Sequence, residues 1–238
     1  MLVLGIRLCQ DQGMFELNSL TGIKRPASLT EEVYSRLYDQ LMTHGIAPGA
    51  RLAVDGLARE LDVSQTPIRE ALVRLEAQGL VVKVHLVGYR VAERMARDRL
   101  DQIYELRLLT EPRLAALAAE RMGDADRRAL NDIAAEMAAE EAAMHTPKAY
   151  ARFSRLDEAF HRMIAMASGN QVIAGALADL HVHVHLFRLA RPPTAISDAI
   201  REHGRLVAAI ACGDPAAAEK AMLHHIRRSR RRFGEERL

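Results

Sequence analysis

Apolar residues recur at helical spacing over most of this chain, and the first well-defined example lies between Leu52 and Leu80. Two apolar stripes follow each other there, separated by residues that start helices. Ser64 is of a type that accepts backbone N–H bonds at a helix start, and Pro67 suits a first turn because its missing N–H would be unpaired there. The pattern predicts two short helices joined by a tight turn. Their buried positions are Leu57, Ala58, Leu61, Ile68, Ala71, Leu72 and Leu75.

The segments on either side of this hairpin extend it into a small domain. Upstream, Thr30 and the two glutamates after it begin a further helix, whose apolar stripe is Val33, Leu37, Leu41 and Met42. Downstream of Gly79, residues 80–84 alternate weakly, residues 85–88 form a turn and residues 89–91 return. These features predict a helix-turn-helix with a two-stranded wing.

Side chains with hydrogen-bond donors gather on the face of the second hairpin helix that is opposite its apolar stripe. A helix-turn-helix places the start of its second helix in the DNA major groove, where such side chains reach base edges and phosphates. The same periodicity fits any amphipathic helical hairpin, so the pattern alone leaves both interpretations open. The residues of this face are Ser64, Gln65, Thr66, Arg69, Glu70 and Arg74.

The remainder of the chain, from residue 98 to residue 233, shows almost no strand-like alternation. Turn signals divide it into six pieces of about 20 residues each. Short connections make neighbouring helices antiparallel, so we expect an all-α bundle of about six helices. The dividing signals are Gly123-Asp124, Thr146-Pro147, Ser168-Gly169-Asn170, Arg191-Pro192-Pro193 and Gly213-Asp214-Pro215.

Composition adds a few limits to this mainly α fold. The 238 residues permit two modest domains, and 49% hydrophobic with 4% aromatic residues favours helical packing rich in alanine and leucine. A net charge of +2 means that a nucleic-acid surface must arise from local clustering. Two cysteines and the lack of a long apolar run predict a cytoplasmic protein without a membrane span. Residues 1–28 are expected to form a disordered arm, and Met14 offers a second start.

Four residues of the second domain have the chemistry of metal ligands. Asp157 and His161 are four apart and share a helix face, although this spacing also suits a surface ion pair. His203 and His225 lie at similar distances on either side of the turn at residues 211–215, so an antiparallel hairpin places them level. Three imidazoles and a carboxylate suit a borderline divalent ion such as Zn²⁺, Ni²⁺ or Mn²⁺.

The first domain resembles the winged helix of GntR-family transcription regulators. The resemblance covers residues 29–92 and implies that Arg51, Thr66, Arg69 and Gly88 meet DNA. Gln65 stands where the family usually has arginine, and glutamine favours adenine. The wing tip has His85-Leu86-Val87 in place of the arginine-rich tip of the family, a departure that argues against a strong minor-groove contact. His85 is still expected to be among the residues that contact DNA. The motifs are Pro48-Gly49-Ala50-Arg51-Leu52, Leu57-Ala58, Val63 through Leu72, Leu75 and Gly79-Leu80.

The second domain resembles the FCD domain, the effector module of FadR-type GntR regulators, and six helices make it similar to the VanR-type branch. In metal-binding members the positions matching Asp157, His161, His203 and His225 hold the ion. The carrying motifs are Glu105-Leu106-Arg107, Glu111-Pro112, Asp157 through His161, Ala167-Ser168-Gly169-Asn170, Arg201-Glu202-His203, Ala209-Ile210, Gly213-Asp214 and Ala221-Met222 with His225.

The same resemblance implies a small organic acid as effector. Arg107 matches an arginine that meets its carboxylate, because a guanidinium fork holds both oxygens at once. The other interpretation of Arg107 is an intrahelical pair with Glu111, four residues on. On a helix, His181 and His185 share a face, so either of them can line the effector pocket or be half-exposed.

Together these features predict a ligand-responsive DNA-binding regulator, expected to act as a repressor. A pseudo-palindromic double-stranded operator requires two recognition helices, so a homodimer is expected. Two alternatives remain open at this point. One is a metal-dependent hydrolase using a metal-bound water, and the other is an architectural DNA-binding dimer whose histidines are structural.

Overall fold

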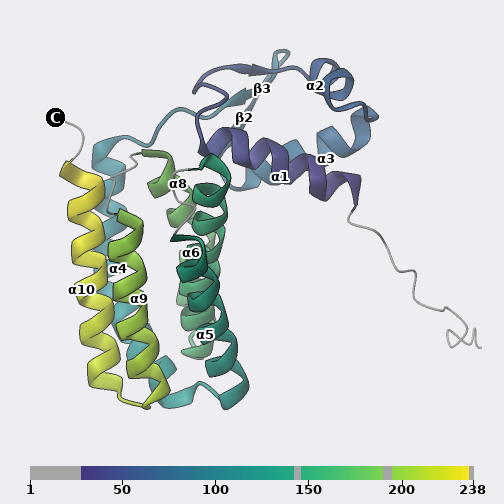
Figure 1. Ribbon diagram of the computed structural model, residues 1–238. Coiled ribbons are helices and arrows are strands. Elements are labelled where there is room, and N and C mark those ends of the chain that lie inside the picture. The colour runs from purple at the N-terminus through teal and green to yellow at the C-terminus, as the bar shows by residue number, and fades with distance from the viewer. Residues whose placement is uncertain (1–27, 142–145, 190–194, 236–238) are drawn as a thin grey trace, which may run out of the picture.

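A computed structural model describes residues 28–141, 146–189 and 195–235. A small domain of helices and strands, here called the head, sits at one end of a long helical bundle (Figure 1). The expected N-terminal arm lies outside the described residues apart from Ser28. That serine caps the first helix, because its Oγ accepts a hydrogen bond from the backbone N–H of Glu31 at 3.2 Å.

The head has the predicted helix-turn-helix and wing. Its helices are α1 (Leu29–Met42), α2 (Val54–Leu61) and α3 (Gln65–Ala77). Its antiparallel sheet has the strand order β1-β3-β2, formed by β1 (Arg51–Leu52), β2 (Val81–Val84) and β3 (Gly88–Val91). Strand β1 was not predicted from the sequence, because two residues are too few to show alternation.

The connection between α2 and α3 turns sharply at Asp62, whose φ of 53° lies in the left-handed region. Ser64 occupies the predicted N-cap position of α3, although within the described head its side chain makes no capping hydrogen bond. The apolar stripe of α3 packs as expected. Its residues Ile68, Ala71, Leu72 and Leu75 are fully buried against α1 and β2.

The bundle consists of long helices that run side by side beneath the head (Figure 1). Helix α10 packs along α4 and α9, while α5 packs against α6 and α9. Its helices are α4 (Arg97–Arg121), α5 (Asp124–Ala139), α6 (Pro147–Ala167), α7 (Gln171–Asp179), α8 (Val182–Leu189), α9 (Ala195–Ala211) and α10 (Pro215–Glu235).

The piece between Asn170 and Arg191, predicted as one helix, forms two. Asn170 begins α7 by accepting a hydrogen bond from the N–H of Ile173. The helix then ends before His181, whose φ of 43° cannot continue a right-handed helix. The described part of the bundle therefore contains seven helices, so the helix count gives no support to the VanR-type branch.

Head and bundle are joined by direct contacts at α6 and α8. The phenol of Tyr38 on α1 donates to Ser154 Oγ on α6 at 3.3 Å, and Arg155 forms a 3.0 Å ion pair with Asp39. On α8, Arg188 Nη2 donates to the backbone oxygen of Ala92 at 2.8 Å. Because the core is also continuous across this junction, the orientation of the head depends on α6 and α8.

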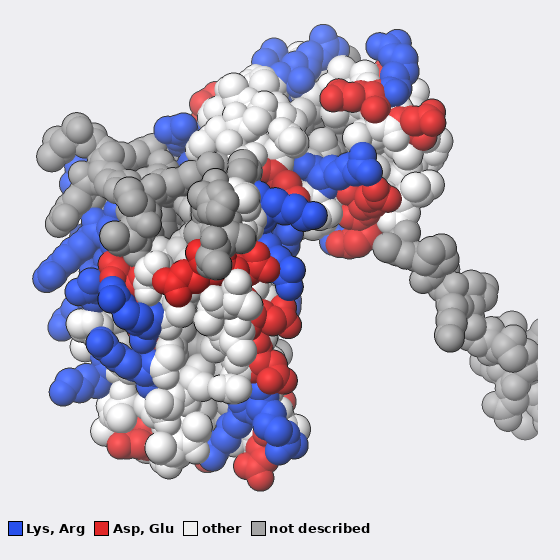
Figure 2. Space-filling model, in the orientation of Figure 1, with Lys and Arg blue, Asp and Glu red and all other residues white. Residues whose placement is uncertain are grey.

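The surface of the bundle is charged unevenly. Figure 2 shows lysine and arginine side chains along the side formed by α10 and acidic side chains toward the opposite side. The exposed arginines of α10 are Arg227, Arg228, Arg230 and Arg231. Two of them form ion pairs, with Asp198 and Asp101. As for membranes, none of the described helices combines the length and the apolar character that a crossing requires.

Candidate functional site

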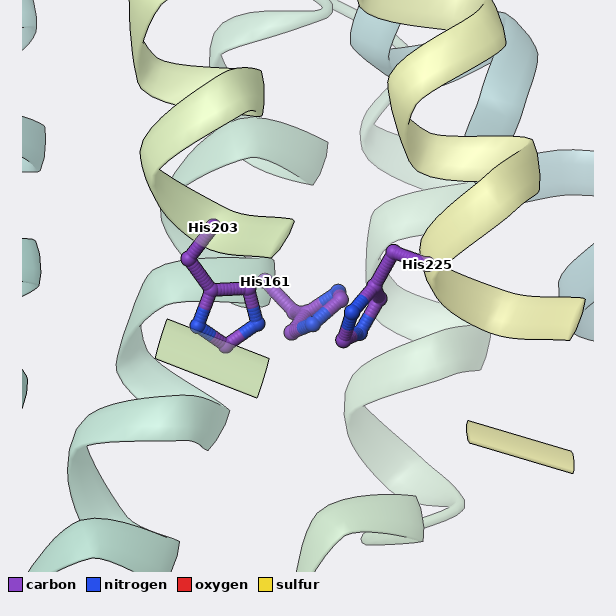
Figure 3. Close-up of side chains that lie close together, drawn as sticks. All are labelled: His161, His203 and His225. Carbon is purple, nitrogen blue, oxygen red and sulfur yellow. The ribbon is translucent and has the colours of Figure 1, made fainter. Parts of the chain in front are cut away.

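Three histidine rings converge inside the bundle from three different helices. Figure 3 shows His161 of α6, His203 of α9 and His225 of α10 turned toward one another. Their ring centroids lie 5.5 Å (His161 to His203), 5.1 Å (His161 to His225) and 4.7 Å (His203 to His225) apart. All three residues are buried, so the cluster lies away from solvent.

Asp157, one helical turn before His161, brings a carboxylate to the same place. Its Oδ1 lies 3.3 Å from His203 Nε2, and its Oδ2 bonds Nδ1 of His183 on α8 at 2.6 Å. The structure thus brings together the four predicted ligands and adds a fourth histidine. One possible ligand set is His161, His203 and His225, and a second is Asp157, His161 and His183, with the donor atoms of each set within 4.8 Å of one another.

Two further carboxylates hold the histidine rings from outside the cluster. Glu111 Oε2 lies 2.7 Å from Nδ1 of His161, and Glu202 Oε2 lies 2.9 Å from Nδ1 of His225. A carboxylate on one ring nitrogen leaves the other nitrogen for a metal and makes it a better ligand. The sequence analysis assigned neither glutamate to this site. Glu202 directly precedes His203, but sequence spacing did not indicate that it reaches the ring on α10.

Several nitrogen atoms of the cluster lack a hydrogen bond. Among the described residues, none hydrogen-bonds to Nε2 of His161 or to either ring nitrogen of His203. A buried polar atom without a partner costs roughly 1–3 kcal/mol, and a bound cation would remove that cost. The donors are imidazole nitrogens and a carboxylate, which suit a borderline divalent ion. The residues present therefore fit a metal.

The protonation states at the cluster also suit metal binding. Burial lowers the pKa of His161, His203 and His225, so these rings are neutral near pH 7. Burial alone would raise the pKa of Asp157, but the neighbouring His183 holds it well below its usual range. Neutral imidazoles beside an ionised carboxylate are the forms that bind a cation.

The contacts of Arg107 confirm the intrahelical pair and leave the effector interpretation as a prediction. Its Nε forms a 2.5 Å ion pair with Oε1 of Glu111, as the intrahelical interpretation requires. Its Nη1 and Nη2 are buried and hydrogen-bond to none of the described residues, so the outer ends of the fork remain unused. Arg107 lines a narrow hollow together with Asp157, His225 and Arg232, and the free volume of this hollow is about 10 Å³. That volume holds about one water, so an anion could reach the free end of the guanidinium only if the surrounding side chains move.

A second hollow, with a free volume of about 40 Å³, is lined mainly by residues of α6, α7 and α8. His161, His183 and His181 line it together with the small apolar residues Ala165 and Ala174. Arg107 and His181 therefore face different hollows, whereas the sequence predicted that both bind the same effector. The prediction for His181 and His185 assumed a single helix, whereas His181 lies in the bend before α8.

His185 points in a different direction from that prediction. Its ring lies against Gly79 in the head, with Nε2 3.1 Å from the place that a Cβ on Gly79 would occupy. Burial, followed by the nearby charge of Arg188, lowers the pKa of His185 to about 4. It does not line either hollow beside the cluster. In this structure His185 is part of the junction between head and bundle.

The predicted DNA-contacting residues form an exposed surface on the head, with one exception. Arg74 lies on α3 but turns toward α1, where its Nη1 pairs with Glu31 Oε2 at 2.6 Å and its guanidinium covers the Tyr34 ring. The geometry thus gives no support to Arg74 as part of this surface. Gly88 in the wing has a φ of 98°, which requires glycine. Arg74 is itself exposed, and the other exposed residues are Arg51, Ser64, Gln65, Thr66, Arg69, His85 and Gly88.

Comparison with known proteins matches both parts of the chain. Residues 29–91 match the model for bacterial regulatory proteins of the gntR family, and residues 102–228 match the FCD domain. LutR, an HTH-type transcriptional regulator of Bacillus subtilis, is 30% identical over 203 residues, which cover 76% of this chain and 90% of LutR. GlaR, an HTH-type transcriptional repressor of Escherichia coli, is 28% identical over 202 residues, which cover 81% of this chain and 90% of GlaR.

The fold has a counterpart among solved structures. The structure of Escherichia coli McbR superposes with a TM-score of 0.65 at 24% identity, and the alignment covers 88% of this chain and 98% of that one. The order of head and bundle is therefore shared with an independently determined structure.

Proposed function

This chain belongs to the GntR family of bacterial regulatory proteins and carries an FCD domain, and from this premise we propose that it is a ligand-responsive transcriptional repressor. It binds a pseudo-palindromic operator in the bacterial cytoplasm as a homodimer. A small organic acid, bound beside a divalent metal ion in the bundle, controls its affinity for DNA. The choice of repression follows its relative GlaR, which is named a repressor, whereas LutR is named a regulator.

The observation that carries the control mechanism is the set of buried nitrogen atoms without hydrogen bonds in the histidine cluster. His161, His203 and His225, whose ligand atoms lie within 4.8 Å of one another, would hold the ion together with Asp157, which lies 3.3 Å from His203. Zn²⁺, Ni²⁺ and Mn²⁺ suit this donor set. The bound ion would supply a positive charge that attracts a carboxylate. Glu111 and Glu202 keep the rings of His161 and His225 oriented by their hydrogen bonds.

Arg107 is proposed to select an acid as the effector. The unused Nη1 and Nη2 atoms of its buried guanidinium can hold both oxygens of one carboxylate. Glu111 fixes the third nitrogen, so the fork is held in place before the ligand arrives. Burial and the Glu111 carboxylate act in opposite directions on the pKa of Arg107, and the net effect raises it, so the guanidinium stays charged. His181 lines the other hollow, so a single small acid held by Arg107 does not also contact His181.

Helix α8 offers a path from the effector site to DNA. Near its first turn, His183 bonds the Asp157 carboxylate, and near its last turn Arg188 donates to the Ala92 backbone oxygen in the head. A ligand that moves Asp157 or His183 displaces a helix that contacts the head directly. The change in DNA affinity cannot exceed the difference in the ligand's affinity for the two arrangements of the bundle.

The DNA contacts proposed for each head come from α3, the strand before α2 and the wing. Those residues are Arg51, Ser64, Thr66, Arg69, His85 and Gly88. One head contacts only half of a palindrome, so a dimer is needed to place two α3 helices about one DNA turn apart. A metal-dependent hydrolase has no such use for an exposed recognition helix.

A DNA selection followed by an effector titration tests this function. The purified chain, loaded with Zn²⁺, is used to enrich sequences from a random DNA library, and the affinity for the enriched sequence is measured by fluorescence anisotropy. We expect a pseudo-palindromic consensus and a dimer on DNA, with affinity that falls when a metal-chelating 2-hydroxy acid is added. The metal-free protein should not respond to the acid. If no sequence is enriched, the proposed function is wrong, and if DNA affinity ignores every acid tested, the architectural alternative replaces it.

A further inference from the structure

Three polar side chains on the exposed surface of the head form a chain of hydrogen bonds. Gln65, the first residue of α3, donates from Nε2 to Oδ1 of Asp55 on α2 at 2.5 Å. The same side-chain amide accepts, through Oε1, a hydrogen bond from Nη2 of Arg69 at 3.1 Å. Asp55, Gln65 and Arg69 are all exposed, so none of them is held in place by packing. Their arrangement therefore follows from these contacts.

The charges at the two ends fix the orientation of the Gln65 amide. An amide presents one oxygen acceptor and one NH₂ donor, which can exchange places by a flip. In the observed orientation the NH₂ group faces the Asp55 carboxylate and the oxygen faces the Arg69 guanidinium. The flipped orientation would place oxygen against carboxylate and NH₂ against guanidinium, which is repulsive at both ends. The amide is thus a hydrogen-bonded bridge between the Asp55 carboxylate and the Arg69 guanidinium.

This bridge uses the same two groups that a base-reading glutamine uses. Glutamine recognises adenine by donating from its NH₂ group to N7 and accepting at its oxygen from the N6 amino group. In Gln65 one N–H is bonded to Asp55, and the oxygen accepts one bond from Arg69. Each group keeps one further hydrogen-bonding position, so the bridge sets the direction of the amide without using up its capacity.

The presence of Asp55 on this surface supports the same conclusion. An acidic residue in the first turn of α2 is favoured by the helix dipole, but that effect explains no contact with a different helix. A bare carboxylate on a DNA-binding face repels phosphates. Bonded to Gln65, and through it linked to Arg69, Asp55 instead becomes the anchor of a cation.

Arg69 keeps most of its donors. A guanidinium has five N–H groups in a rigid fork, and the bond to Gln65 uses one of them. The remaining N–H groups can bond O6 and N7 of guanine, which is the preferred base of arginine in the major groove. A fork whose direction is set before binding loses less rotational freedom when it meets the base.

We infer that Gln65 is a positioning residue, which holds the Arg69 guanidinium for guanine by bridging it to Asp55. This inference rests on the proposed DNA-binding function. It gives Gln65 a role other than the adenine contact expected from the sequence.

The test compares base preferences selected from a random DNA library by the full-length chain and its variants. The variants are Asp55→Ala, Gln65→Ala, the double variant, Asp55→Asn and Arg69→Ala. Glu60→Ala is the matched control, since Glu60 is an exposed acidic residue on the same helix as Asp55. Affinities for the wild-type consensus are measured by anisotropy, and thermal unfolding is recorded for each variant.

We expect Asp55→Ala and Gln65→Ala each to lower the affinity about 5-fold, which is the effect of about one hydrogen bond. Both should relax the preference for guanine at the one position that Arg69→Ala also relaxes. The double variant should be no weaker than either single variant, because the two residues act through one chain of contacts. Asp55→Asn should retain the preference because its amide oxygen still accepts from Gln65. Glu60→Ala should leave the preference unchanged, and unfolding temperatures should not move.

Two outcomes would contradict the inference. If Gln65→Ala loses a preference for adenine while Asp55→Ala keeps the wild-type consensus, Gln65 reads a base and the inference is wrong. The inference is also wrong if the double variant shows the sum of two independent losses. If the wild-type chain enriches no DNA sequence, the proposed DNA-binding function is wrong. This outcome differs from a failure of the inference, in which the wild type still enriches a consensus.

Discussion

The buried histidine cluster and the exposed face of α3 differ in how their polar atoms are satisfied. In the cluster, His161 and His203 are buried and leave ring nitrogens without hydrogen bonds to any described residue. On α3, Gln65 and Arg69 are exposed, and their polar groups are paired or open to water. The buried cluster therefore carries a free-energy cost for its unpaired nitrogens that the exposed face of α3 does not carry. An unpaired polar atom is expensive only where water cannot reach it.

This difference predicts opposite consequences for the fold. A metal that binds the cluster removes a cost that the folded bundle already carries, so metal binding should stabilise the protein strongly. Contacts made by the α3 surface replace contacts with water, so its side chains should matter for DNA affinity and little for stability.

Removing two ligands should abolish metal binding. We expect wild-type protein to carry close to one divalent ion per chain and the His203→Ala/His225→Ala variant to carry none, as measured by elemental analysis after reconstitution. Metal at 100 times its dissociation constant should stabilise the wild type by about 2.7 kcal/mol in thermal unfolding. The double variant should not respond. His224→Ala, which removes an exposed histidine next to His225, is the control. If the wild-type protein takes up no metal, the histidine cluster is not a metal site and the contrast does not hold.

Removing the principal donor of the α3 surface should have the converse effect. Arg69→Ala should weaken binding to the selected operator by about 1–3 kcal/mol, the value of a good bidentate contact with a base. Its metal content and unfolding temperature should equal those of the wild type, since Arg69 is exposed. Anisotropy and elemental analysis on the same preparation check both halves. A loss of metal in this variant would show that the two regions are not separable.

The junction between the two regions should give the protein a pH-dependent stability. His185 packs against Gly79, and its pKa falls from 6.5 to about 4 on folding. Between these values the unfolded chain binds a proton that the folded chain does not, so stability is lost as pH falls from 6.5 toward 4. The loss attributable to this residue is at most about 3 kcal/mol, because one pKa unit corresponds to 1.36 kcal/mol.

Urea unfolding of metal-free protein at pH 7.5 and pH 5 measures this loss. His185→Gln should lose less stability between the two pH values than the wild type does. His224→Gln, which alters an exposed histidine of the bundle, should behave like the wild type. Equal losses in all three proteins would place the pH dependence in the histidine cluster and not at the junction.

The smallest expected effect lies outside both regions. Asn170→Ala removes the side-chain oxygen that caps α7, where it bonds the N–H of Ile173 at 3.1 Å. The expected loss is about 1 kcal/mol of unfolding free energy, with unchanged metal content and DNA affinity. Asn170→Asp, which retains an oxygen at that place, should recover most of the stability. A variant that loses metal would mean that the position of α7 helps to build the site.

Local patterns were sufficient for much of this molecule. The stripe from Ile68 to Leu75 predicted α3 because helical spacing alone determines which side chains share a face. Thr146-Pro147 and Ser168-Gly169-Asn170 separated helices for equally local reasons, and the structure begins α6 and α7 directly after Thr146 and Asn170. The antiparallel hairpin around residues 211–215 also brought His203 and His225 to the same level, because short connections leave few arrangements.

Other features depended on which helices pack against each other. Glu202 reaches His225 across the α9–α10 contact, and Glu111 reaches His161 from α4 to α6. His183 meets Asp157 because the chain bends at His181 and redirects α8, which no apolar period in this segment indicated. The same bend sends His185 toward the head, where the sequence had suggested a pocket residue.

Local sequence patterns were enough to predict most of the helices, the order of head and bundle, and four residues with the chemistry of metal ligands. Periodicity and capping act over a few residues, so they can be recognised without knowing the rest of the fold. Only the tertiary structure decided which carboxylates hold the histidine rings, which hollow Arg107 faces and which groups occupy the amide of Gln65. These contacts join residues from different helices, and their geometry is set by packing and not by spacing along the chain.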